Sequence, residues 1–114
     1  MKTNFAFIVF IFLIVCASSS FATIYYVNGT TGNDAWDGLA AVWDGVHGPK
    51  KTIQAGINVS ANKDTVSVAN GTYTGAGNKN LDFGGKSITV MSQGGAANCI
   101  IDCEGSGRGF YFHS

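Results

Sequence analysis

The chain is poor in the groups on which most catalytic and metal sites depend. Its 114 residues include three cysteines, two histidines and one proline, and charged residues make up 12% of the total. Removal of the first 22 residues, which hold one lysine, leaves six Lys and Arg against seven Asp and Glu. This balance excludes the strongly basic surface that binds nucleic acid or an anionic membrane.

The chain also lacks an apolar run long enough to cross a bilayer. The longest run, residues 5–17, has 13 residues, whereas a membrane-spanning helix needs about 20. A lysine precedes this run and Ser-Phe-Ala22 follows it, which is the pattern of a secretory signal peptide. We predict that residues 1–22 are a signal peptide, that the mature chain begins at Thr23 and that the protein is secreted. A membrane anchor and a lipidated Cys16 are the alternatives.

Glycine and short alternating segments are what the chain has in quantity. All 16 glycines lie after residue 22, which indicates many turns. Three segments that alternate polar and apolar residues, 65–68, 87–90 and 109–112, recur at an interval of 22 residues. No amphipathic helix separates them, which argues against a βαβ crossover. We therefore predict an all-β fold, a right-handed parallel β-helix of about three coils.

A short helix is predicted ahead of these strands. Residues 51–61 place Ile53 and Ile57 on one side of a helix, with Thr52 as its N-cap. Such a helix would close the open end of the coil and keep its apolar interior from water. The predicted organisation is a signal peptide (1–22), an N-terminal strand, loop and capping helix (23–63), and the first coils of the β-helix (64–114).

Residues 28–51 are predicted to be an irregular loop with several turn signals, among them Asp37-Gly and Asp44-Gly. The loop holds both tryptophans, Trp36 and Trp43. One interpretation is a small hydrophobic plug, which a loop of this length needs, and the other is a platform for a ligand. The sequence assigns no partner to either histidine.

The two cysteines after the apolar run, Cys99 and Cys103, are not expected to bond to each other. On one strand their Cα atoms would lie about 13 Å apart, and a disulfide needs about 7 Å or less. They are interpreted as small buried residues or as partners of cysteines further along. Two thiols without a nearby histidine do not predict a metal site.

Calcium is the one cofactor for which the sequence offers candidate ligands, namely Asp82, Asp102 and Glu104. In the predicted fold these side chains point outward, and equivalent positions on neighbouring coils lie about 4.8 Å apart, close enough for two carboxylates to share the ion. The alternative is three solvated side chains. A second group of oxygen donors, at Asn33, Asp34 and Asp37, lacks the spacing of an EF-hand and is explained by turn formation.

Seven short motifs together resemble the N-terminal part of secreted right-handed β-helix proteins of the pectate-lyase-like superfamily. They are residues 25–27, 33–38, 52–54, 64–66, 71–73, 86–90 and 99–102. The resemblance implies a protein that binds or cleaves extracellular polysaccharide, or a non-enzymatic adhesin or cell-surface scaffold, and it leaves the chemistry open. Members usually continue for many more coils, so we expect the chain to be a fragment.

The resemblance also says where catalytic residues would stand. Members that cleave polysaccharide are expected to carry acidic and basic side chains on the outer face of the stacked strands. None of the corresponding outward positions is acidic or basic here: Thr65, Ser67, Ser87, Thr89, Gly109 and Tyr111. We therefore expect no catalytic activity from this segment, whether its parent is a polysaccharide lyase, a glycoside hydrolase or neither.

Overall fold

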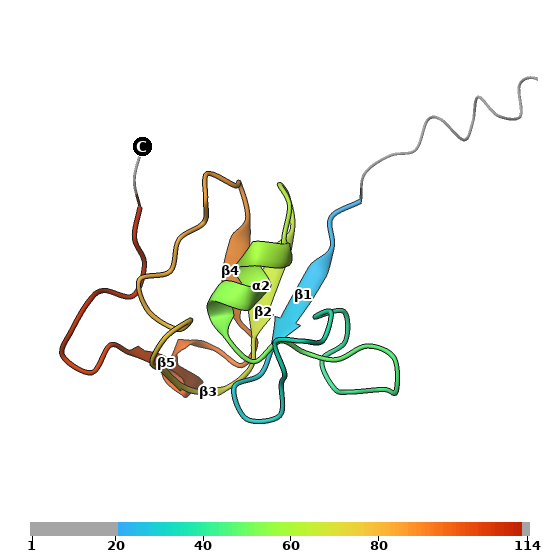
Figure 1. The fold of residues 1–114 in the computed structure, drawn as a ribbon, viewed down its shortest axis with the longest axis horizontal. Coiled ribbons are helices and arrows are strands. Elements are labelled where there is room, and N and C mark those ends of the chain that lie inside the picture. Colours follow the sequence, from blue (N-terminus) through green and yellow to red (C-terminus); the bar gives the residue numbers. More distant parts are fainter. Residues whose placement is uncertain (1–20, 113–114) are drawn as a thin grey trace, which may run out of the picture.

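A computed structural model describes residues 21–112 and shows a small mixed α/β fold (Figure 1). Its elements are β1 (Ile24–Val27), α2 (Ile53–Val59), β2 (Thr65–Val68), β3 (Gly71–Thr74), β4 (Thr89–Ser92), the 3-10 turn η1 (Ala96–Asn98) and β5 (Cys99–Asp102). The predicted signal peptide lies outside the described residues except for its last two positions. Between residues 21 and 112 no helix is long and apolar enough to cross a membrane.

The strands pair in parallel to form two small sheets. One sheet has the order β1-β2-β4, and the other joins β3 to β5. Within residues 21–112 neither sheet closes or continues as a solenoid, and a helix belongs to the fold. The prediction of an all-β fold, a right-handed parallel β-helix, is therefore wrong. The N-terminal strand predicted at residues 23–27 is confirmed as β1.

The 22-residue interval is wrong as well. β2 pairs with β4 so that Thr65 lies opposite Thr89, an interval of 24 residues. Phe110 forms an isolated bridge with Leu81 and does not join the sheet that contains β2. Side chains along a strand alternate with a period of two, so a shift of two residues leaves the same positions facing the core. Alternation alone therefore identified the strands without fixing their register.

Helix α2 begins where the sequence predicts. The side-chain oxygen of Thr52 accepts a hydrogen bond from the main-chain N–H of Ala55 at 3.3 Å, which confirms Thr52 as the N-cap. Ile53 and Ile57 are buried, so the predicted apolar side of the helix is also confirmed. Because the helix has only seven residues, its stability has to come mainly from packing.

The core lies between this helix and the first sheet, where Figure 1 shows α2 in front of β2. A Cβ atom added at Gly56 would lie 2.7 Å from Cγ2 of Val27 and 2.9 Å from Cγ1 of Val66. The absence of a side chain at Gly56 thus lets the helix approach β1 and β2 closely. Seven side chains form the buried core: Val27, Ile53, Ile57, Val66, Val68, Tyr73 and Leu81.

Two polar side chains join segments that are far apart in the sequence. The amide of Gln54 donates to the carbonyl of Asp82 and accepts from its N–H, both at 2.9 Å, as a neighbouring strand would. The carboxylate of Asp64 accepts from the N–H of Ala61 at 2.7 Å and from that of Thr23 at 2.9 Å. These N–H groups lower the pKa of Asp64, so this buried carboxyl is ionised at neutral pH.

Candidate functional site

Residues 28–51, which we name the tryptophan loop, gather around the carboxyl end of β1 (Figure 1). Tyr26 of β1 donates its N–H to the carbonyl of Gly38 and accepts from the N–H of Lys50, both at 2.8 Å. Gly38 in turn donates to Gly48 at 2.8 Å. The loop therefore satisfies main-chain groups of an edge strand that would otherwise be open, and this fixes the loop to the sheet.

The two tryptophans of this loop form one stack. The ring centroids of Trp36 and Trp43 lie 4.5 Å apart with an interplanar angle of 19°. A Cβ atom at Gly48 would lie 2.5 Å from Cε3 of Trp36 and 2.8 Å from Cε3 of Trp43, so glycine is needed beside both rings. Trp43 is 46% exposed although Trp36 covers part of it. Trp36 is half-buried and Trp43 is exposed, so the stack presents an aromatic surface to solvent.

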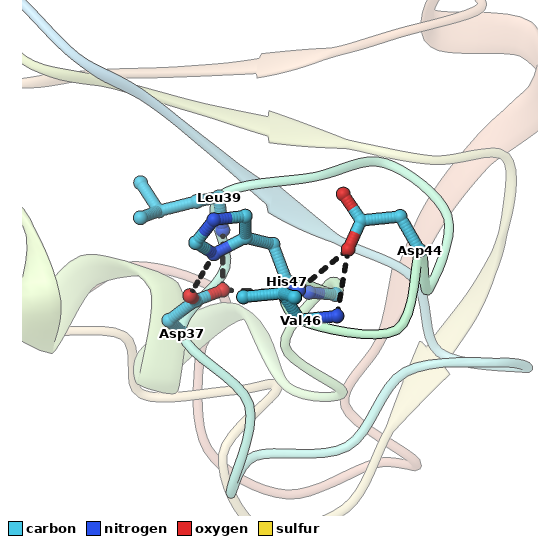
Figure 2. Close-up of polar contacts among 6 residues, drawn as sticks. Asp37, Leu39, Asp44, Val46 and His47 are labelled. Carbon is cyan, nitrogen blue, oxygen red and sulfur yellow. Dashed lines mark hydrogen bonds and ion pairs between the residues drawn. The ribbon is translucent and has the colours of Figure 1, made fainter.

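Polar contacts of Asp37 and His47 hold together the part of the tryptophan loop that carries the stack. Figure 2 shows these contacts. Nδ1 of His47 hydrogen-bonds to Oδ2 of Asp37. The other oxygen, Oδ1, accepts from the N–H of Leu39 at 3.0 Å and from that of Gly48 at 3.3 Å. The His47 contact and the Leu39 N–H lower the pKa of Asp37 to about 2, and Asp37 raises the pKa of His47. Asp37 therefore favours its negatively charged form, and His47 favours its positively charged form.

Asp44 closes the second turn of the loop in the same way. Its Oδ1 accepts from the N–H of His47 at 2.7 Å and from that of Val46 at 2.9 Å, as Figure 2 shows. These two N–H groups lower the pKa of Asp44. No local sequence pattern identified a partner for His47, because Asp37 is ten residues away. The two Asp-Gly turn signals were the available clue, since two turns bring the intervening ends together.

Other apolar side chains of the tryptophan loop are exposed as well. Four large ones on the tryptophan loop are exposed to solvent: Leu39, Val42, Trp43 and Val46. Val42 is 74% exposed and Val46 is 71% exposed, so the tip of the loop is apolar while its base is fixed by carboxylates. Such a combination suits contact with the apolar face of a ligand, with hydrogen-bonding groups at its border.

A second candidate surface lies where the first sheet ends. A hollow of about 450 Å³ is lined by residues that follow β1, β2 and β4, namely Asn28, Ala69, Asn70, Gln93 and Gly94. We name it the strand-end hollow. Gln93 donates its N–H to the carbonyl of Val68 at 2.7 Å, so the lining is fixed by the sheet. The carboxamides of Asn70 and Gln93 make no hydrogen bond within residues 21–112 and are available to a ligand.

Only one of the three calcium candidates, Asp102, lies in the second sheet. Asp102 belongs to β5 opposite Thr74, whereas Asp82 follows the residue that bridges Phe110. Oδ1 of Asp102 accepts from the N–H of Glu104 at 2.8 Å, and Glu104 itself lies in the turn that follows β5. Residues 21–112 hold no group of three or more His, Cys, Asp or Glu side chains arranged for a metal. Calcium binding at these residues stays a prediction.

Turn formation, as predicted, accounts for the other oxygen-rich group. Asn33 accepts from the N–H of Ala35 at 2.8 Å. Asp34 reaches further, because its Oδ1 accepts from the N–H groups of Lys51 at 2.7 Å and Thr52 at 2.8 Å. Asp34 therefore fastens the tryptophan loop to the start of α2. The sequence identified these residues as turn formers but not this longer contact.

Cys99 and Cys103 are both free, so the expectation that they do not bond to each other is confirmed. Both thiols are half-buried, and burial raises the pKa of Cys99. A thiol that is harder to ionise is a poorer nucleophile and a poorer metal ligand at neutral pH. Cys99 is therefore a weak candidate for a catalytic or metal site.

The resemblance to the pectate-lyase-like superfamily rests on the short motifs alone. The function of this chain has to follow from the side chains of the tryptophan loop and the strand-end hollow. Compared with protein-family models, curated proteins and solved structures, the chain matches none.

Proposed function

We propose that this protein is secreted and binds saccharide through the open face of Trp43. The observation that carries the proposal is a tryptophan held in a fixed stack with almost half of its surface exposed. Keeping a large apolar ring in water is unfavourable unless a ligand covers it. The C–H face of a pyranose is apolar and flat, and its burial against an indole removes apolar surface of both partners from water.

The polar groups near the stack complement the rim of a sugar ring. Asp37 and Asp44 have lowered pKa values and are carboxylates at neutral pH, so they accept hydrogen bonds from hydroxyl groups. Their Oδ1 atoms are already occupied by main-chain N–H groups, which fixes their direction. Fixed acceptors around an aromatic face provide orientation as well as contact area.

The strand-end hollow supports the same class of ligand. A carboxamide offers both a donor and an acceptor, which matches a pair of neighbouring hydroxyl groups. No charged side chain lines the hollow. We therefore propose a neutral saccharide in preference to an acidic one, with the main contact at Trp43 and a secondary contact at Asn70.

The proposal is tested by titrating the full chain with cellohexaose while tryptophan fluorescence is recorded. We expect saturable binding, at least tenfold weaker binding for Trp43→Ala, and a loss of about 1 kcal/mol or less for Asn70→Ala. Trp43→Phe keeps an aromatic face and should lie between Trp43→Ala and the wild type. Val59→Ala is the matched control, since it removes an exposed valine side chain that lies on α2 and outside the tryptophan loop.

Two results would contradict the proposal. One is the absence of saturable binding to cellohexaose. The other is equal affinity of the wild type and Trp43→Ala, because binding would then occur elsewhere on the chain. Penta-galacturonate serves as the acidic comparison, and tighter binding of this probe would contradict the preference for a neutral ligand.

A non-enzymatic adhesin is the second candidate, and the exposed valines favour it. Val42 and Val46 lie at the tip of the tryptophan loop and would be buried by a protein partner more readily than by a sugar. Under this hypothesis Val42→Ser and Val46→Ser reduce attachment of the protein to cell surfaces, whereas Trp43→Phe does not. The saccharide hypothesis predicts the opposite ranking, so the same variants distinguish the two functions.

A further inference from the structure

The hydrogen bonds of the fold begin at Thr23, the residue predicted to start the mature chain. Its main-chain N–H donates to Oδ1 of Asp64, and its carbonyl accepts from the N–H of Thr65, both at 2.9 Å. Phe21 is 82% exposed, and within the described part of the chain neither Phe21 nor Ala22 makes a hydrogen bond or ring contact. The first anchored residue and the predicted cleavage position therefore coincide, although one comes from structure and the other from sequence.

The group that receives Thr23 is a carboxylate with little access to water. Asp64 is 6% exposed, and its second oxygen accepts from the N–H of Ala61 at 2.7 Å. Lys86 is the nearby cation whose charge acts on it, but Nζ of Lys86 donates to the carbonyls of Ile57 at 2.6 Å and Ser60 at 2.8 Å. The carboxylate is thus held by neutral N–H donors, although a buried charge is stabilised most by a directly bonded opposite charge.

We propose that Asp64 is the binding site for the α-ammonium group that signal peptidase creates on Thr23. Hydrolysis of the Ala22–Thr23 peptide bond consumes one water, breaks the C–N bond, and leaves a carboxylate on Ala22 and an amino group on Thr23. This amino group, with an ordinary pKa of about 7.7 to 8.0, takes up a proton at neutral pH. The nitrogen that already lies 2.9 Å from Oδ1 then carries a full positive charge.

Processing thereby strengthens one defined contact at the start of the first sheet. Asp64 directly precedes β2, and Thr23 directly precedes β1. A charge-assisted hydrogen bond between them is about twice as strong as the neutral one that the uncleaved chain makes. Removal of the leader therefore does more than release the protein, because it also fastens β1 to β2. The inference is independent of saccharide binding, which involves neither residue.

The test uses the full chain, secreted from a host that has a signal peptidase. N-terminal sequencing of the product is expected to begin at Thr23. The melting temperature of this product is then compared with that of the same product after selective acetylation of its α-amine. At about pH 6 the free amine should raise the melting temperature by about 4 °C in the wild type and by less than about 1 °C in Asp64→Asn.

A second readout does not depend on the stability of the Asp64→Asn variant. The pKa of the α-amine, measured by NMR titration of the wild type, should exceed about 8 because the carboxylate favours the charged form. The stabilisation should disappear above that raised pKa, and also as the pH falls below 3.8 and Asp64 takes up its proton. A product that begins elsewhere, no processed product, an α-amine pKa at or below about 8, or equal melting temperatures of the two forms would each overturn the inference.

Discussion

The core and the tryptophan loop of this protein are held together by different means. Around α2 the side chains of Ile57 and Val66 are fully buried, and the helix lies so close to the sheet that only glycine fits at position 56. In the loop, by contrast, Val42 and Val46 are largely exposed, and main-chain N–H groups bonded to carboxylates define the path of the chain. One region excludes water, whereas the other uses polar side chains to replace it.

This difference shows how a small chain orders a long loop without enlarging its core. Each aspartate of the loop accepts two N–H groups that no strand or helix would satisfy, so few main-chain groups lose water without gaining a partner. The exposed apolar tip is then free to serve a ligand because the loop does not need it for its own stability.

Deletion of core volume should have the largest effect. Ile57→Ala is expected to lower the free energy of unfolding by about 2 to 5 kcal/mol, because it removes buried methyl groups and leaves a cavity. The matched loop variant Val46→Ala should change it by less than about 0.5 kcal/mol, since the side chain is exposed. Chemical denaturation measures both. A similar decrease in the free energy of unfolding for the two variants would contradict the claim that the core and the loop are stabilised by different means.

Removal of a polar tether should have an intermediate effect. Asp34→Ala deletes the acceptor of two main-chain N–H groups and of the Thr52 hydroxyl, at 2.7 to 2.9 Å, and should lower the free energy of unfolding by about 1 kcal/mol. Asp34→Asn keeps one carbonyl oxygen at the same place and is the control, with a smaller loss. Thermal unfolding measures both variants. Equal losses would show that charge matters more than hydrogen-bond geometry.

Titration of His47 and Asp37 should have the smallest effect and should be confined to the loop. The pKa of His47 is raised above 6.5, so its contribution is complete below pH 6.5 and is lost as pH rises through the raised value. The pKa of Asp37 is lowered from 3.8 to about 2, so its contribution is complete above 3.8 and is lost as pH falls toward 2. Tryptophan emission should therefore be constant between pH 3.8 and 6.5 and change on either side.

The variant His47→Gln separates the two transitions. It should abolish the change above pH 6.5 and leave a change at low pH, because Asp37 still accepts from the N–H groups of Leu39 and Gly48. An alkaline transition that survives in this variant would mean that another group titrates beside the stack. Circular dichroism of the core should stay constant across the same upper range.

The parts of the fold that the sequence predicted are those with local causes. Thr52 and the spacing of Ile53 and Ile57 determine the helix within one segment, and β1 follows from a short run of β-prone residues. Strand pairing depends on turns of unequal length. Alternation with a period of two cannot reveal whether a strand is shifted by two residues against its partner. The error in register and the error in fold class have this single origin.

The candidate site was predictable to a similar extent. Trp36 and Trp43 were singled out as the two tryptophans of one loop, and the structure brings their rings together in a stack. A role of the stack as a ligand platform stays a prediction. The bond between His47 and Asp37 and the reach of Asp34 to the helix depend on how several turns combine. No local pattern contains that information. The proximity of the predicted calcium ligands was derived from a fold that the chain does not adopt, so calcium binding at these residues stays a prediction.

The unequal intervals between paired segments have an evolutionary consequence. Twenty-four residues separate Thr65 from Thr89, but 28 separate Gly71 from Cys99. The four added residues lie between β4 and β5, where the chain turns at Gly95, whose φ is positive. A chain built in this way can gain or lose residues in its turns while each strand keeps its partner. Related sequences should therefore differ most in length between these segments, so that a search for a fixed period would overlook them.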